Sequence, residues 1–323
     1  MHALLERLGH PERRYGAVHV VGTKGKSTAA RTVAALLRAE GRRAAAYTSP
    51  HVSGWWERLE TDPAGFHEAV ARVRSAAEAV GASQFEILTA AAFADFAERG
   101  VETAVVEAGV GGRLDATNVI DAEVVLLTNV GLDHVELLGD TREAIAREKL
   151  AVARREATVV LPDDEFAGLV PDRRVLLGGA REAASAALGR AVQAEVEVHL
   201  PGRLELRPGE VRDGAHTPEA VDWLLERLPE AGPYVVVASL LADKDVDAIL
   251  ERLARAGSTF VATQSANDRA LAAAELAERA RRVFARVEIA ADPAAALGLA
   301  RSLGSPLLVT GSLYLLADLS VAE

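Results

Sequence analysis

The chain has 323 residues, half of them apolar and about a quarter charged, with a formal net charge of −11 and no cysteine. This length suits two domains, and the composition is that of a folded protein. The charge argues against a nucleic-acid surface, and the missing cysteines exclude disulfides and thiolate metal sites. With no run near the roughly 18 apolar residues that span a bilayer and no signal-peptide core, we expect a soluble, cytoplasmic protein. Small-molecule ligands and a monomer are expected, without nucleic-acid or membrane partners.

The first half alternates apolar runs with segments of helical periodicity. Helices are predicted at 27–40 and 85–99. Strands are predicted at 17–21, 44–48, 103–107, 124–128 and 158–161. Such alternation is typical of a mostly parallel sheet covered on both faces.

A quieter region at 162–179 predicts a loop, followed by a helix at 181–191 and a strand at 196–200. The domain boundary is placed there, giving domains 1–199 and 200–323. The second half predicts strands at 234–238, 259–263, 286–290 and 307–310, and helices at 218–228, 246–256, 268–282 and 293–303. About 120 residues of this kind predict a smaller, Rossmann-like α/β domain.

Residues 22–28 read GTKGKST between the first strand and the first long helix. A strand, a glycine-lysine-serine turn and a helix form a phosphate cradle, since backbone N–H groups and the helix dipole face one point. Lys26 would reach outer phosphates, and Ser27 or Thr28 a magnesium ion. The eight-residue Walker pattern is incomplete, because Val20 stands where it has glycine. The fold class is thus predicted as α/β, with a P-loop ATPase domain followed by the smaller domain.

Polar residues after the strands are the next candidates, because ligands bind at the carboxyl edge of a parallel sheet. Glu107 fits a ligand of an oxygen-preferring cation and equally a helix cap or a loop salt bridge. Ser49 precedes Pro50, which favours an extended, presented serine. His134 lies beside Asp133, although single histidines are more often structural. By position alone Lys149 is expected to be a solvated lysine at a helix end.

The second domain has fewer candidates. Arg203 follows a Pro-Gly turn, and Asp213 and His216 precede a predicted helix, where an ordinary N-terminal cap is an equal reading. The sequence Asp-Lys-Asp at 243–245 fits a charged turn.

Several motifs together resemble folylpolyglutamate synthase/dihydrofolate synthase, a branch of the Mur ligase superfamily. The likeness runs from about residue 3 to residue 316. The motifs are GTKGKST, TSPH at 48–51, FEILTAAAF at 85–93, VVEAGVGGRLDATNVI at 105–120, TNVGLDHVELLGDTREAIAREK at 128–149, PGRLE at 201–205, DGAHTP at 213–218, DKD at 243–245 and GSLY at 311–314.

The resemblance implies a role for each matched position. ATP phosphates would be lined by Thr23, Lys24, Gly25, Lys26 and Ser27, with nucleotide contacts from Arg203 and Asp213. Two magnesium ions are implied, with Ser49, Glu107, His134 and a carbamylated Lys149 as ligands. The pterin substrate would lie against Ser83, Gln84, Phe85, Glu86, Leu114, Asp115 and Ala116. Lys26, Lys149 and His216 would be catalytic.

The implied activity is ATP-dependent addition of L-glutamate to a folate through an acyl phosphate. The region between 161 and 201 is short for the family, and an asparagine near the adenine has no match around Glu182. The family's stretch ahead of the phosphate loop has no counterpart before Met1, which favours polyglutamylation over dihydrofolate synthesis. Alternatives are a Mur-type peptide ligase of cell-wall synthesis and a non-catalytic ATP-binding or regulatory module. A GTPase-like switch is disfavoured because no NKxD motif follows a strand.

Overall fold

The computed structural model describes residues 1–229 and 232–322, which divide into two compact units. The first unit comprises Met1–His51 and Trp55–Val198, and the second Val52–Gly54 and the chain from His199 onward. The segment Val52–Gly54 joins the second unit because Val52 is buried in an apolar cluster there. Residue 323, the last of the predicted second domain, lies outside the described residues.

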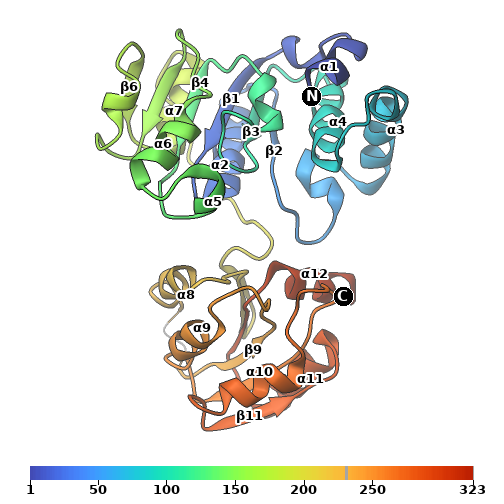
Figure 1. The fold of residues 1–323 in the computed structure, drawn as a ribbon, viewed down its shortest axis with the longest axis vertical. Coiled ribbons are helices and arrows are strands. Elements are labelled where there is room, and N and C mark those ends of the chain that lie inside the picture. The colour runs from blue at the N-terminus through green and yellow to red at the C-terminus, as the bar shows by residue number, and fades with distance from the viewer. Residues whose placement is uncertain (230–231, 323) are drawn as a thin grey trace. The chain divides into compact units, whose positions relative to one another are not determined.

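The first unit is built on six parallel strands in the order β2-β3-β1-β4-β5-β6 (Figure 1). Their bounds are β1 Gly16–Val21, β2 Ala44–Tyr47, β3 Thr103–Glu107, β4 Val124–Leu127, β5 Thr158–Leu161 and β6 Arg174–Leu177. Parallel pairing brings the carboxyl ends of β1 to β4 to one edge, where the phosphate loop begins.

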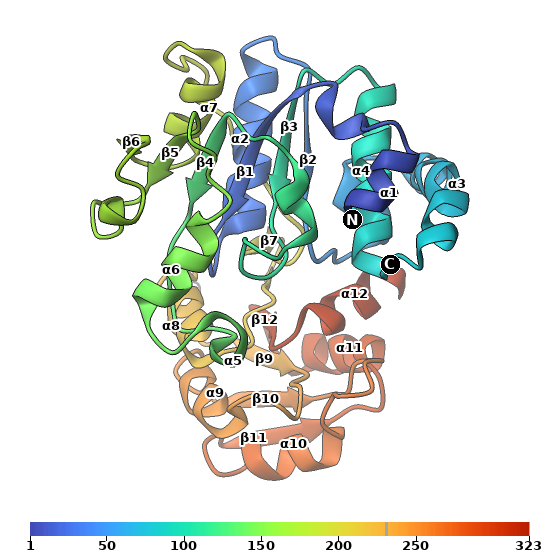
Figure 2. The same ribbon diagram turned by 45° about the horizontal axis from the view of Figure 1, so that its top comes forward.

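Helices cover both faces of this sheet (Figure 2). They are α1 His2–Arg7, α2 Lys26–Ala39, α3 Pro63–Val80, α4 Gln84–Glu98, α5 Val135–Leu138, α6 Arg142–Leu150 and α7 Ala180–Leu188, with 3₁₀ turns η1 Pro11–Arg13, η2 Trp55–Leu59, η3 Ala116–Val119 and η4 Ala167–Leu169. Val18 and Val20 of β1 pack in the cluster that contains α2 and α7. Ala17 and Val21 pack in the cluster that contains α3, α4 and α6. Alternation along a strand therefore sends successive side chains into two different cores.

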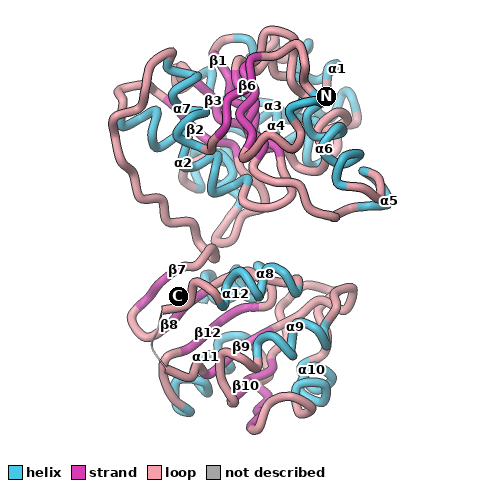
Figure 3. The backbone as a smooth tube through the Cα atoms, turned by 90° about the vertical axis from the view of Figure 1, so that its left-hand side faces the viewer, coloured by secondary structure: helices cyan, strands magenta, loops and turns pink. Residues whose placement is uncertain are grey.

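The second unit repeats the layered arrangement on a smaller scale (Figure 3). Its strand order is β11-β10-β9-β12-β8-β7, parallel except for the antiparallel hairpin β7–β8. The elements are β7 Glu205–Arg207, β8 Glu210–Arg212, α8 Pro218–Leu225, β9 Val235–Ala238, α9 Val246–Leu253, β10 Thr259–Ala262, α10 Ala273–Ala280, β11 Arg286–Ile289, α11 Pro293–Leu303, β12 Leu307–Thr310 and α12 Leu313–Ala322.

The predicted α/β fold class is confirmed, and nearly all predicted strands form within a residue of their expected bounds. Two local predictions are wrong. The expected loop at 162–179 contains β6, an edge strand whose residues are only partly buried. The expected strand at 196–200 does not form; it contributes a single bridge between Leu200 and Arg203. An alternating pattern becomes a strand only where a neighbouring strand pairs with it, and beyond this bridge no ladder to residues 196–200 forms.

The hairpin β7–β8 and the helices α3 and α12 were not predicted from the sequence. Within the described residues, no helix combines the length and the apolar character needed to cross a lipid bilayer.

Candidate active site

The loop between β1 and α2 has the geometry of a phosphate cradle. Gly25 adopts a left-handed conformation with φ of 78° immediately before α2, whose first residues are Lys26 and Ser27. At Gly22, an added Cβ would lie 2.0 Å from Thr128 Oγ1, so this close approach admits only glycine. The N-terminus of a 14-residue helix and a glycine turn therefore face the same point.

Residues that follow β4 hold this loop in place. The Thr23 N–H donates to the Asn129 carbonyl at 3.1 Å, and the Lys24 N–H donates to Asn129 Oδ1 at 2.9 Å. The Thr128 hydroxyl donates to the Lys24 carbonyl at 2.7 Å. The loop is thus fixed before any ligand arrives. Sequence reasoning missed Thr128 and Asn129, although Thr128 ends a predicted strand and Asn129 directly follows it.

Glu107, at the end of β3, is where three strand ends meet. Its side chain is 2% exposed, and Oε1 accepts from Ser27 Oγ at 3.1 Å. Oε2 accepts from the Ser49 N–H at 2.9 Å. A buried carboxylate beside two serines offers the oxygen donors that a hard cation prefers.

His134 lies on an exposed loop before α5, with its Nε2 3.9 Å from Asp133 Oδ1. Among the described residues, no three His, Asp or Glu side chains gather closely enough to hold a metal ion. A cation bound at Glu107 would therefore need at least one ligand other than a carboxylate or an imidazole, such as a hydroxyl, phosphate or carbamate oxygen.

Lys149 is buried, and the expectation of a solvated helix-end lysine is wrong. Its side chain reaches from α6 to the phosphate loop, where Nζ donates to the Gly22 carbonyl at 2.8 Å. Burial, followed by the positive charge of Lys26, lowers the pKa of Lys149 from 10.5 to about 8. A substantial fraction of the Lys149 amine is therefore neutral at mildly alkaline pH.

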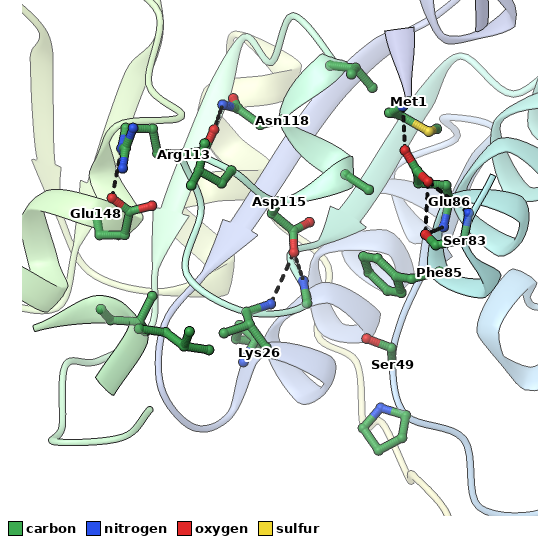
Figure 4. Close-up of a pocket in the computed structure, with 18 of the residues that line it drawn as sticks. Met1, Lys26, Ser49, Ser83, Phe85, Glu86, Arg113, Asp115, Asn118 and Glu148 are labelled. Atoms are coloured by element: carbon green, nitrogen blue, oxygen red, sulfur yellow. Dashed lines mark hydrogen bonds and ion pairs between the residues drawn. The ribbon is translucent and has the colours of Figure 1, made fainter. Parts of the chain in front are cut away.

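A cavity of about 1000 Å³ opens in the first unit beside the phosphate loop (Figure 4). It brings together Lys26, Ser49 and six of the seven residues predicted to hold a pterin. Those six are Ser83, Phe85, Glu86, Leu114, Asp115 and Ala116. Gln84 is exposed and does not line this cavity.

Ser83 and Glu86 also serve as a helix cap. Ser83 Oγ accepts from the Glu86 N–H at 3.3 Å, and Glu86 Oε2 accepts from the Ser83 N–H at 2.9 Å. This is a capping box at the start of α4, and its Ser-x-x-Glu pattern is visible in the sequence. The amino group of Met1 pairs with Glu86 Oε1. Phe85 is therefore the aromatic side chain that the cap presents to the cavity.

The wall opposite α4 is the loop 109–115. An added Cβ on Gly109 would lie 2.8 Å from the Phe85 ring and 2.9 Å from Asp115 Oδ2. Arg113 Nε donates to Glu148 Oε2 at 2.9 Å, which ties the loop to α6. Leu114 is 79% exposed and offers an apolar surface at the opening of the cavity.

The chain on either side of the hairpin β7–β8 brings together the three site residues predicted in the second unit, which are Arg203, Asp213 and His216. Asp213 accepts from the Leu204 and Ala215 N–H groups at 2.7 and 2.8 Å, so it holds the turn after Arg203 and does not cap α8, where Thr217 is the cap. Burial raises the pKa of Asp213. An added Cβ on Gly214 would lie 3.2 Å from Arg203 Nη1.

His216 lies next along this segment. Its Nδ1 is 2.7 Å from the Gly214 carbonyl oxygen and must carry the ring proton there, because a carbonyl only accepts. Asp245 caps α9, which confirms the charged turn at 243–245.

The lowered pKa of Lys149 predicts a pH dependence of stability. Between about pH 8 and 10.5 the native lysine loses its proton before the unfolded one, so unfolding takes up a proton and stability rises with pH. We expect the free energy of unfolding of the wild type to rise relative to Lys149→Met by at most about 1.4 kcal/mol per pH unit in this window. Urea titrations at pH 7 to 10, in carbonate-free buffer with a chelator, measure the difference. A flat difference would contradict the burial of the amine.

Comparison with known proteins matches both units of the chain to a single group of ligases. Residues 20–172 match the Mur ligase middle domain, and residues 202–313 match the Mur ligase glutamate ligase domain. The chain is 32% identical to the dihydrofolate synthase/folylpolyglutamate synthase of Mycobacterium tuberculosis, over 93% of this chain and 81% of that protein. It is 31% identical to the folylpolyglutamate synthase of Lacticaseibacillus casei, over 97% of this chain and 91% of that protein. These alignments run over 395 and 391 positions, so the relatives contain stretches without a counterpart here.

Solved structures of the same group superpose closely. Mycobacterium tuberculosis folylpolyglutamate synthase complexed with ADP and AMPPCP has a TM-score of 0.88 and 29% identity, covering 99% of this chain and 94% of that one. Escherichia coli FolC in complex with DHPP and ADP has a TM-score of 0.85 and 26% identity, covering 99% and 91%. A bifunctional folylpolyglutamate synthase/dihydrofolate synthase with Mn, AMPPNP and L-glutamate bound has a TM-score of 0.82 and 25% identity, covering 99% and 92%. This chain therefore belongs to the folylpolyglutamate synthase/dihydrofolate synthase family of Mur ligases, which join L-glutamate to folates at the expense of ATP.

Proposed function

We propose that this chain adds L-glutamate to a folate, with the pterin end of the substrate in the cavity beside the phosphate loop. One observation carries the proposal: Lys26 of the phosphate loop lines the same cavity as Phe85, Leu114 and Asp115. An anionic group held at Lys26 and an aromatic substrate held against Phe85 would thus share one space. The relatives' complexes with ADP, DHPP and L-glutamate support this reading.

The phosphate loop would bind the triphosphate of ATP. Gly25 and the first backbone N–H groups of α2 offer donors and a positive dipole. Thr23 and Lys24 line the same loop, where their own N–H groups are held by Asn129. Lys26 offsets the negative charge that otherwise keeps a carboxylate away from the γ-phosphate. In the second unit, Arg203 and Asp213 are proposed nucleotide contacts, and His216 a residue near the reacting groups.

The residues present fit divalent magnesium. Ser27, Ser49 and Glu107 supply oxygen donors at the buried meeting point of three strand ends, and His134 and Lys149 are the further proposed ligands. Bound magnesium would neutralise phosphate charge during transfer. A carbamate on Lys149 would turn a buried cation into an anion suited to a second ion. Carbamylation needs the neutral amine, which the lowered pKa of about 8 favours.

The chemistry proceeds in two steps. The substrate carboxylate attacks the γ-phosphate, forming an acyl phosphate and releasing ADP. The amine of L-glutamate then attacks the activated carbonyl, the amide bond forms, and inorganic phosphate leaves. Phe85, Leu114 and the loop 109–115 would orient the folate so that its carboxylate meets the phosphate held at Lys26.

Release of ADP by purified protein tests the function. With magnesium and ATP, we expect turnover with tetrahydrofolate plus L-glutamate, because the cavity takes an aromatic ring system next to the phosphate loop. Parallel reactions contain dihydropteroate plus L-glutamate or a UDP-muramoyl peptide with its amino acid. Turnover only with the muramoyl substrate would replace the proposal by a peptide ligase, and none with any acceptor would favour a non-catalytic ATP-binding module.

Replacing Glu107 tests the cation site. Glu107→Gln removes the charge but keeps the shape, so we expect turnover to fall at least about 100-fold, as for the loss of one strong electrostatic contact in an active site. ATP binding measured by calorimetry in EDTA should change little. The matched control is Glu123→Gln, an exposed glutamate immediately before β4, at the opposite edge of the sheet. Equal losses in the two variants would argue against a cation at Glu107.

Replacing Lys149 tests the carbamate. Lys149→Ala should lose most turnover and regain part of it with added formate or acetate, because a small carboxylate can occupy the space of the carbamate. Methylamine at the same concentration is the control, since it restores a cation instead of an anion. Rescue by the amine alone would show that the cationic lysine is the active form.

A further inference from the structure

A buried histidine on β1 faces the wall of the cavity and has no part in the chemistry above. His19 is 1% exposed, and its Nε2 lies 2.8 Å from Oγ1 of Thr117, which is fully buried in η3. Thr117 follows the cavity-lining loop 109–115 by two residues. The contact therefore joins the strand that leads into the phosphate loop to the segment that ends the cavity wall.

Hydrogen-bond directions along this contact follow from proton counting. The Thr117 hydroxyl has one proton and donates it to Asp115 Oδ1 at 2.5 Å. It must then accept from His19, so the ring proton of His19 is on Nε2. Nδ1 is buried without a hydrogen-bond partner in the described part of the chain. Burial, followed by the nearby charge of Arg154, lowers the pKa of His19 to about 3, so the ring is neutral at physiological pH.

At the end of this chain of hydrogen bonds, the Asp115 carboxylate accepts as many bonds as it can hold. Oδ1 accepts from the Thr117 hydroxyl and from the Thr117 N–H at 2.9 Å. Oδ2 accepts from the Gly109 and Val110 N–H groups, both at 3.0 Å. A carboxylate offers about four lone-pair directions, and all four are used by Gly109, Val110 and Thr117. Figure 4 shows the two bonds that the Asp115 carboxylate accepts from the backbone of the loop.

We infer that His19, Thr117 and Asp115 are positioning residues that hold the loop 109–115 as the folate-binding wall, with Asp115 as the clamp on the loop. This inference rests on the proposed folate site for its effect on activity, although the clamp itself does not. The clamp sets the position of the peptide at Gly109, against which the Phe85 ring packs with no space for a Cβ. Releasing it would loosen the two sides of the cavity together.

Matched substitutions separate the effect of a lost hydrogen bond from the effect of a changed side-chain shape. Thr117→Val keeps the shape and loses the hydroxyl, whereas Thr117→Ser keeps the hydroxyl. His19→Leu loses the donor, whereas His19→Gln can still donate from its amide. We expect Thr117→Val and His19→Leu to raise the KM for folate about tenfold, the effect of roughly one buried hydrogen bond, with the KM for ATP within about twofold of wild type. The serine and glutamine variants should lie closer to wild type.

Amide hydrogen exchange of the substrate-free protein measures directly whether Asp115 holds the loop. In Thr117→Val, the Gly109 and Val110 amides should exchange about tenfold faster, while those of β3 keep their protection. If wild type shows no folate-dependent ADP release, the proposed function fails and the exchange result still decides whether the clamp exists.

Three outcomes would overturn the inference. One is unchanged exchange in Thr117→Val. Another is an equal rise in the KM for ATP and for folate, which indicates a general structural role. The third is a folate defect in Asp115→Asn without one in Thr117→Val or His19→Leu, which would show that the three residues do not act together.

Discussion

The first unit depends on a buried carboxylate at the meeting point of three strands. Glu107 ends β3, accepts from Ser27 at the start of α2, and accepts from the backbone of Ser49 after β2. A 2% exposed carboxylate is costly unless it is hydrogen-bonded or meets a cation, so this position constrains the three segments around it. The phosphate loop and the loop after β2 are thereby held at one edge of the sheet.

Positive charge is distributed around this edge in two different environments. Lys26 is partly exposed at the cavity, as a residue that meets an incoming anion must be. Lys149 is buried and bound to the carbonyl of Gly22, where its pKa falls. The charge of Lys26 adds to the cost of keeping Lys149 protonated, which the phosphate groups of ATP would relieve on binding.

The cavity walls use hydrogen bonds that are complete within the protein itself. Ser83 and Glu86 cap α4, and Asp115 accepts four bonds from the segment 109–117. Side chains occupied in this way give the site its shape, while Phe85 and Leu114 offer surface for an aromatic ligand. Small-molecule sites usually present apolar and aromatic surface together with a small number of fixed polar groups.

The sequence by itself determined the strand–turn–helix of the phosphate loop, the parallel α/β class and the strand-end position of Glu107, because these follow from local periodicity and glycine placement. It also contains the capping pattern at 83–86, which the family resemblance assigns to substrate contact. Tertiary structure alone decided the environment of Lys149, whose partner Gly22 is 127 residues away. It likewise decided the contact between His19 and Thr117, which lie 98 residues apart, since burial and distant hydrogen bonds arise only when separate segments meet.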